Sequence, residues 1–164
     1  MAPRRHNART AGFTLIELVV TLAIIGLIAT AAMPLASVAM KREKETQLRS
    51  ALREIRSAID AYKVAGEQGR IQIEADKSGF PPTLAVLVEG VDDASKAQAG
   101  SKIYFLRRLP RDPFFPDAHA TAAETWGLRS YESEPDNPQP GDNVYDVYSL
   151  SADKGLNGIQ YHDW

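Results

Sequence analysis

The sequence predicts an α+β protein in which one long N-terminal helix packs on a small antiparallel sheet. Three observations predict this class. Residues 13–40 form an apolar run, the chain up to about residue 64 keeps a helical period with one polar face, and the C-terminal part holds short aromatic and β-branched segments between turns. With 164 residues, the chain has room for one small domain besides the apolar run.

The apolar run is long enough to cross a membrane. As a helix, residues 13–40 would extend about 42 Å, against a hydrocarbon core of about 30 Å. Glu17 is the single charged residue within the run. A charged side chain costs about 2.5–3.5 kcal/mol at the centre of a membrane helix and less near its end, so such a residue usually has a function or a specific partner.

The apolar run continues into an amphipathic helix. Apolar residues recur at spacings of four, three, four and three, with Arg and Glu between them: Leu48, Leu52, Ile55, Ile59 and Tyr62. We therefore expect one helix from about Phe13 to Val64 that ends near Gly66. Residues 41–49, KREKETQLR, have mixed signs and no aromatic residue, which predicts a solvated helix face rather than a nucleic-acid patch.

The rest of the chain predicts a short helix and an antiparallel pair of strands. Pro81 and Pro82 precede a leucine-rich segment with helical spacing that stops near Gly90. The segments ETWGLRSY at 124–131 and NVYDVYSL at 143–150 have the composition of strands, and a polar loop rich in proline joins them.

No residue pattern predicts an enzyme. The chain has no Cys, which excludes disulfides and thiol nucleophiles, and its three His are His6, His119 and His162. Phosphate loops and the common hydrolase and zinc-protease motifs are absent from the sequence. His119 lies in a loop rich in Pro and Ala, which predicts a surface residue. We therefore expect no catalytic residues.

Residues 12–18 read GFTLIEL and follow a short segment that is basic and free of acids. This stretch resembles the class III signal of type IV pilins and of type II secretion pseudopilins, in which a basic leader ends in Gly and Glu is the fifth residue after the cleaved bond. The resemblance implies that a prepilin peptidase cleaves between Gly12 and Phe13 and methylates the new amine of Phe13.

The resemblance also divides the chain into three parts with a pilin-like fold. Residues 1–12 are a cleaved leader, residues 13–40 are a transmembrane and assembly helix, and residues 41–164 are a periplasmic globular domain that includes the second half of the long helix. The implied protein sits in the inner membrane with a single span and a leader that is cytoplasmic before cleavage. Counting Lys and Arg beside the span gives the opposite topology, and the prediction here follows the resemblance.

A role in assembly follows from the same resemblance. The subunit is implied to polymerise, with other pseudopilins, into a pseudopilus on the inner-membrane platform of a type II secretion system. Glu17 then meets the Phe13 amine of a neighbouring subunit, so that its charge is compensated only after docking. Gly26 and Pro34 match positions that bracket a segment that unwinds in filaments; a simple kink of a membrane helix is the alternative.

Three further segments resemble the G-type, or major, pseudopilin: SGFPPTLAVL at 78–87, LPRDP at 109–113 and YDVYSLSAD at 145–153. The absence of Cys also separates the chain from type IV pilins that close a C-terminal disulfide loop. A minor pilin of a type IV pilus stays open as an alternative. So does a soluble secreted domain released by ordinary signal peptidase after ATA at 29–31, although the apolar run is about twice the usual length for such a signal.

The C-terminal loop holds the one candidate metal site. G-type members carry a calcium loop there, and the resemblance implies Asp153, Asn157 and Asp163 as ligands, together with backbone carbonyls. The adjacent acidic pair typical of the family is missing. The alternative is a loop without a cofactor, held by turns at 154–155 and 157–158 and anchored by Trp164.

Overall fold

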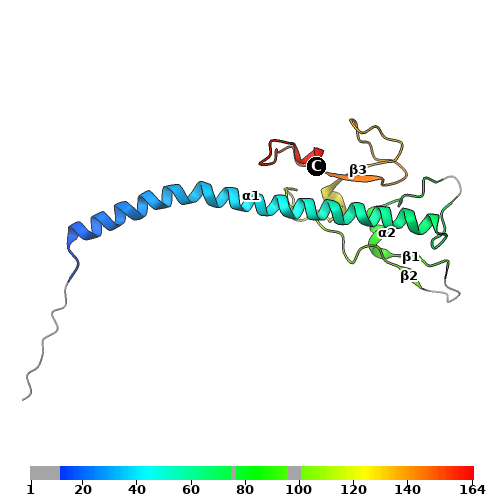
Figure 1. Ribbon diagram of the computed structural model, residues 1–164, viewed down its shortest axis with the longest axis horizontal. Coiled ribbons are helices and arrows are strands. Elements are labelled where there is room, and N and C mark those ends of the chain that lie inside the picture. Colours follow the sequence, from blue (N-terminus) through cyan, green and yellow to red (C-terminus); the bar gives the residue numbers. More distant parts are fainter. Residues whose placement is uncertain (1–11, 75–76, 96–100) are drawn as a thin grey trace, which may run out of the picture. The chain divides into compact units, whose positions relative to one another are not determined.

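The computed structural model describes residues 12–74, 77–95 and 101–164, and it divides the chain into two compact units, Met1–Met40 and Lys41–Trp164. Apart from Gly12, the predicted leader lies outside the described residues. In chain order the elements are α1 (Leu15–Glu67), α2 (Leu84–Glu89), β1 (Val91–Asp92), β2 (Lys102–Ile103), the 3-10 helix η1 (Ala123–Thr125), β3 (Trp126–Arg129), β4 (Asp146–Ser149) and the 3-10 helix η2 (Tyr161–Asp163) (Figure 1). The predicted α+β class is confirmed.

Helix α1 has about the predicted length, and it ends where predicted, with Gly69 forming the terminal turn. Its 53 residues stop at Glu67, and Gly69 has a φ of 67°, the left-handed conformation typical of a helix C-terminus. The Arg70 N–H donates to the Ala65 carbonyl at 2.9 Å and the Gly69 N–H to the Gly66 carbonyl at 2.9 Å, which is the hydrogen-bond pattern of a Schellman motif. The predicted end near Gly66 agrees with the observed end to within one residue.

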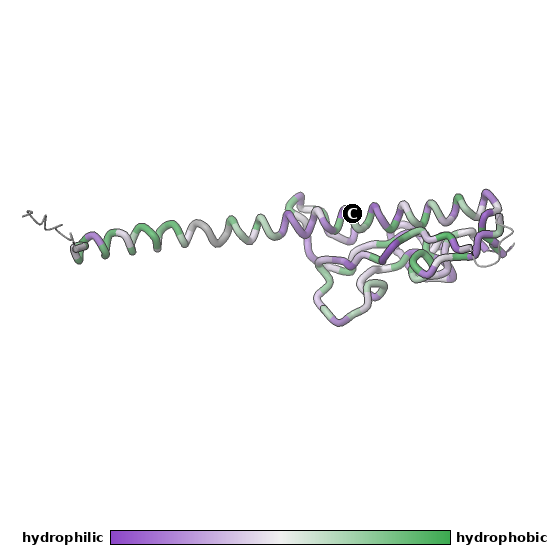
Figure 2. The backbone as a smooth tube through the Cα atoms, turned by 90° about the horizontal axis from the view of Figure 1, so that it is seen from below, coloured by the Kyte–Doolittle hydropathy of each residue, from purple (hydrophilic) through white to green (hydrophobic). Residues whose placement is uncertain are grey.

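In the unit Met1–Met40, the described apolar side chains of α1 are exposed. Leu15 is 83 % exposed and Ile25 is 61 % exposed, and Figure 2 shows the hydrophobic colour along this part of the helix. By length and composition, α1 is the one helix among the described residues that can cross a membrane. An uncovered apolar helix of this kind needs lipid or a protein partner around it.

In the unit Lys41–Trp164, the second half of α1 supplies one side of the core. The predicted stripe is buried along its whole length, with Leu48 and Ile55 fully inaccessible and Tyr62 still 7 % exposed. Hydrophobic and hydrophilic residues alternate along this part of the helix (Figure 2). The other side of the core comes from the loops, α2 and the C-terminal strands: Leu84, Leu87, Leu106, Trp126, Val144, Val147 and Tyr161.

Two separate two-stranded sheets complete this unit, where the sequence predicted one. Strands β3 and β4 are antiparallel with Trp126 opposite Ser149, which confirms the predicted pair. Strands β1 and β2 pair Val91 with Ile103 and were not predicted, because two-residue strands show no alternation in sequence. Helix α2 ends as expected at Gly90, whose φ is 76°.

Candidate processing and assembly site

The bond between Gly12 and Phe13 lies in an irregular, exposed segment just before helix α1. Neither residue is in a helix or strand, and the Phe13 side chain is 82 % exposed. A peptidase must hold its substrate in an extended conformation, so a bond outside the helix is accessible in a way that a bond within it would not be. The structure therefore leaves the predicted cleavage position uncovered.

Glu17 is the third residue of α1, and the residue before the helix caps it. The Thr14 Oγ1 accepts a hydrogen bond from the Glu17 N–H at 3.3 Å, which makes Thr14 the N-cap. The spacing Thr-x-x-Glu is that of a capping box, a sequence signal that could have predicted this helix start. A carboxylate in the first turn also faces the positive end of the helix dipole. Glu17 thus also stabilises the start of helix α1, besides its predicted role in assembly.

Gly26 and Pro34 both lie inside the helical bounds of α1. A Cβ added at Gly26 would meet no atom within 4 Å in this subunit, so packing within the chain does not require glycine there. Near Pro34, the Thr30 hydroxyl donates to the Leu27 carbonyl at 2.7 Å, a bond that often accompanies local bending. The unwinding of this segment in filaments stays a prediction.

The structure adds a buried carboxylate that the sequence did not predict. Glu45 is 6 % exposed, and its Oε1 accepts hydrogen bonds from the Leu156 N–H at 2.7 Å and the Tyr161 hydroxyl at 3.1 Å. One turn earlier, the Lys41 Nζ donates to the Lys154 carbonyl at 2.7 Å. Glu45 lies three residues before Leu48, in phase with the apolar stripe, and that phase was the signal that could have revealed its burial.

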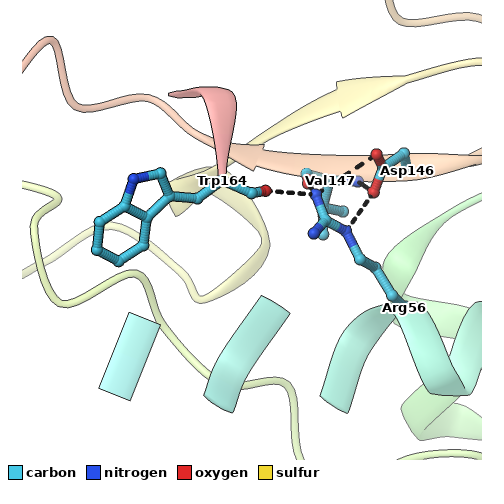
Figure 3. Close-up of polar contacts among 4 residues, drawn as sticks. All are labelled: Arg56, Asp146, Val147 and Trp164. Atoms are coloured by element: carbon cyan, nitrogen blue, oxygen red, sulfur yellow. Dashed lines mark hydrogen bonds and ion pairs between the residues drawn. The ribbon is translucent and has the colours of Figure 1, made fainter. Parts of the chain in front are cut away.

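Arg56 connects α1 with β4 and with the C-terminal segment (Figure 3). Its Nε is 2.7 Å from the Asp146 Oδ1, and its Nη2 donates to the Val147 carbonyl at 3.1 Å and to the Trp164 main-chain oxygen at 2.9 Å. One guanidinium thus holds three groups that are about a hundred residues away in sequence. The planar fork of arginine suits such a junction better than the single ammonium of lysine.

Two of the three residues predicted to bind calcium, Asn157 and Asp163, line a pocket together with arginines. This surface pocket of about 310 Å³ is lined by three arginines and five other residues: Arg49, Arg53, Arg56, Leu52, Asn157, Ile159, Asp163 and Trp164. The Arg49 guanidinium lies 4.2 Å from the centre of the Trp164 ring, a cation–π contact. Arg56 is already paired with Asp146, but Arg49 and Arg53 still outnumber Asp163 among the residues that line the pocket, which disfavours a bound cation.

The predicted calcium ligands therefore fit the ion poorly. Asn157 and Asp163 line the arginine pocket, whereas Asp153 does not. The Asn157 Oδ1 already accepts a hydrogen bond from the Ile159 N–H at 3.1 Å. Within residues 12–74, 77–95 and 101–164, no group of three or more His, Asp or Glu side chains is placed to hold a metal ion.

The two histidines that the structure describes contact different residues. His119 is exposed, as predicted, and its backbone N–H donates to the Asp117 Oδ1 at 2.8 Å. The His162 Nδ1 is 3.2 Å from the Asp163 Oδ1, and its ring packs on Tyr148. The His162 ring thus has local packing and polar contacts, the bond at position 119 involves only the backbone, and His6 lies outside the described residues.

Alkaline pH is expected to destabilise the globular unit through Tyr161. Burial, the hydrogen bond to Glu45 and the nearby charges raise the pKa of the Tyr161 phenol far above its ordinary value of about 10. This contribution to stability is complete below about pH 10 and is lost as the pH rises toward the folded-state pKa, by up to about 1.4 kcal/mol per pH unit. Urea unfolding between neutral and alkaline pH measures it.

Two phenylalanine variants separate this effect from other alkaline titrations. Tyr161→Phe should make the free energy of unfolding less dependent on pH above about 10. Tyr131→Phe, which changes a ring that is 59 % exposed, should leave the pH dependence as in the unaltered chain. Burial also raises the pKa of Tyr62, so some dependence should persist in both variants. An unchanged slope in Tyr161→Phe would contradict the prediction.

Comparison with known families identifies the N-terminal segment. Residues 7–33 match the model of the prokaryotic N-terminal methylation motif. The matched residues include the predicted cleavage and methylation positions, Gly12 and Phe13, and also Glu17 and Gly26. The motif ends one residue before Pro34.

Two known proteins are similar to longer parts of the chain. Over 151 residues, the chain is 27 % identical to the type II secretion system core protein G of Pseudomonas aeruginosa, covering 90 % of this chain and 87 % of that protein. Over 82 residues, it is 34 % identical to the type IV major pilin protein PilA of Myxococcus xanthus, covering 50 % of this chain and 36 % of the pilin. No solved structure matches.

Proposed function

We propose, from the premise that this chain is a pilin-like protein of the pseudopilin type, that it is a subunit of a type II secretion pseudopilus. The methylation motif and the similarity to a core protein G along 90 % of the chain confirm the resemblance predicted from the sequence. In this proposal a prepilin peptidase removes the leader and methylates Phe13. The subunit then polymerises with its own kind and with other pseudopilins.

One observation carries the proposal. A peptide bond outside any helix, between Gly12 and Phe13, is followed directly by an exposed apolar helix with a single carboxylate in its first turn. The exposed bond suits processing, the apolar surface suits lipid and then neighbouring subunits, and Glu17 suits recognition between subunits. No step of this role needs a catalytic group, so we propose a structural subunit rather than an enzyme.

The proposed location follows from the same features. The helix would cross the inner membrane once, with the unit Lys41–Trp164 in the periplasm and the leader in the cytoplasm before cleavage. The assembly platform of the secretion system and the membrane lipid are then its immediate partners, besides other pseudopilins. We propose no nucleic acid among its partners.

The mass of the mature N-terminus tests the processing step. We expect chain produced together with a prepilin peptidase to begin at Phe13 with a methylated amine, as measured by mass spectrometry of the purified protein. Gly12→Val should retain the leader, whereas Gly26→Ala, which changes a glycine with open space around it, should be processed normally. A mature chain that begins at Ala32 would show cleavage by ordinary signal peptidase and would refute the proposal.

A type IV pilus subunit is the second candidate, because half of the chain is 34 % identical to a major pilin. Deleting the gene in its host discriminates the two. Loss of secretion of folded proteins with normal surface pili supports the pseudopilin, and loss of surface pili with normal secretion supports the pilin.

A further inference from the structure

We propose that two side chains of helix α1, Lys41 and Glu45, hold the C-terminal loop 153–161 in place, and that this clamp makes the loop independent of calcium. The proposal concerns the folding of one subunit and goes beyond its assembly into a filament. All the groups involved lie within the unit Lys41–Trp164.

Glu45 forms the anionic half of the clamp. A buried carboxylate is costly unless donors compensate it, and both donors that Glu45 receives come from the C-terminal segment: the Leu156 N–H at 2.7 Å and the Tyr161 hydroxyl at 3.1 Å. If the loop moved away, the carboxylate would lose both partners. The carboxylate and the loop therefore stabilise each other.

Lys41 forms the cationic half. Its Nζ donates to the Lys154 carbonyl at 2.7 Å and lies 5.8 Å from the centre of the Tyr161 ring. Lys41 and Glu45 are one helical turn apart, so they reach the loop from the same face of α1. The Lys41 ammonium binds the carbonyl of Lys154, and the Glu45 carboxylate binds the N–H of Leu156, two residues further along the loop.

The backbone of the loop is arranged for hydrogen bonds rather than for a cation. Calcium binds six to eight oxygen atoms, and a loop that serves it turns carbonyl oxygens inward. Here the Ile159 carbonyl accepts from the Gly155 N–H at 2.8 Å, the Asp153 carbonyl from the Tyr161 N–H at 3.1 Å, and the Gly155 carbonyl from the Gly158 N–H at 2.9 Å. The loop presents the Leu156 N–H and a hydroxyl hydrogen to α1, which a carboxylate binds and a metal ion does not.

The charges near the loop also disfavour calcium binding. Asn157 and Asp163, two of the three residues expected to bind calcium, line the pocket that holds Arg49, Arg53 and Arg56. Positive side chains that line the same pocket as Asp163 repel a calcium ion that would approach it. The clamp thus takes over the structural role that the family resemblance gives to calcium.

Thermal unfolding and tryptic cleavage of the full chain in detergent micelles test the proposal. Both tryptophans, Trp126 and Trp164, lie in the unit Lys41–Trp164, so their fluorescence reports on this unit, and trypsin cleaves after Lys154 within the loop. We expect the same melting temperature and the same cleavage rate in millimolar calcium and in excess EGTA. A bound ion would instead raise the melting temperature by several degrees.

Removing the carboxylate should release the loop. We expect Glu45→Ala to speed cleavage after Lys154 by about tenfold or more, the factor for losing a charge-assisted hydrogen bond. Glu43→Ala is the matched control, because Glu43 is exposed on the same helix and contacts only Gln47 in the described contacts, at 2.9 Å. Equal cleavage of the two variants would overturn the role of Glu45.

Two conservative variants distinguish loss of the loop contact from general unfolding. Glu45→Gln keeps an oxygen that can accept from the Leu156 N–H, and Tyr161→Phe removes only the hydroxyl. If Glu45 acts through the loop, the two changes should affect the melting temperature non-additively, whereas Glu43→Gln combined with Tyr161→Phe should be additive. Additive effects in both pairs, or a calcium-dependent melting temperature of the unaltered chain, would refute the proposal. These measurements on purified protein do not depend on secretion or filament assembly, so they stand apart from the tests of the proposed function.

Discussion

Glu17→Ala is expected to abolish filament assembly while leaving leader cleavage and the fold of the globular unit intact. In the proposed filament, the carboxylate of one subunit meets the free amine of Phe13 in the next. Crosslinking of subunits in membranes measures assembly, and a secretion assay in the host measures its consequence. We expect both signals to fall to background.

The size of this effect follows from the cost of an uncompensated charge in a membrane. A carboxylate at the centre of a membrane helix costs about 2.5–3.5 kcal/mol, and less near the end where Glu17 lies. A neighbouring amine removes most of that cost, so docking is favoured over all registers that leave the carboxylate unpaired. Alanine at position 17 removes the cost of an unpaired carboxylate in the membrane. It also removes the preference for the docked register, because the contact that selects this register is lost.

The structure supplies a control that separates charge from helix capping. Glu17 also occupies the third position of a helix whose N-cap is Thr14, so alanine at position 17 alters both the charge and the helix start. Thr14→Ala removes the cap and keeps the carboxylate, at a cost of about 1 kcal/mol in helix stability. Glu17→Gln keeps a side chain suited to a capping box and removes the charge.

Assembly of these variants should follow the charge. We expect Thr14→Ala to assemble and Glu17→Gln to fail. The reverse pattern would show that Glu17 acts by starting the helix. Normal crosslinking and secretion in Glu17→Ala would rule out any requirement for this residue in assembly.

The parts of the fold that the sequence predicted are those with a long local period. The stripe of Leu48, Ile55 and Tyr62 repeats over several turns, so burial of one helix face could be read without tertiary information, and the structure confirms it. Strands β3 and β4 were predicted because their aromatic and β-branched residues flank a polar loop. The sequence did not predict strands β1 and β2, because two residues are too few to show alternation.

The clamp of the C-terminal loop could not be predicted from composition, because its partners are far apart in sequence. Glu45 and Leu156 are separated by 111 residues, and Arg56 and Asp146 by 90. The mixed charges of the segment 41–49 predict a solvated face when the helix is considered alone. What distinguishes Glu45 from its neighbours is its phase with the apolar stripe, and that phase predicts burial but not the partner.

Truncating the core stripe should strongly lower the stability of the globular unit. Ile55 is fully buried, so Ile55→Ala is expected to lower the free energy of unfolding by about 2–5 kcal/mol and Ile55→Val by about 0.5–1.5 kcal/mol, because each deleted methyl or methylene group leaves unfilled space. Domains of this kind are stable by only about 5–15 kcal/mol, so alanine removes a large share.

Urea unfolding followed by tryptophan fluorescence measures these losses, since Trp126 and Trp164 both belong to the unit that Ile55 supports. Val64→Ala is the matched control: it truncates a β-branched residue on the same helix, but Val64 is 45 % exposed, so we expect a change within about 0.5 kcal/mol. Because lipid rather than this core surrounds residues 13–40 in the proposed setting, neither variant should alter membrane insertion. Similar losses for Ile55→Ala and Val64→Ala would mean that this face of α1 does not form the core.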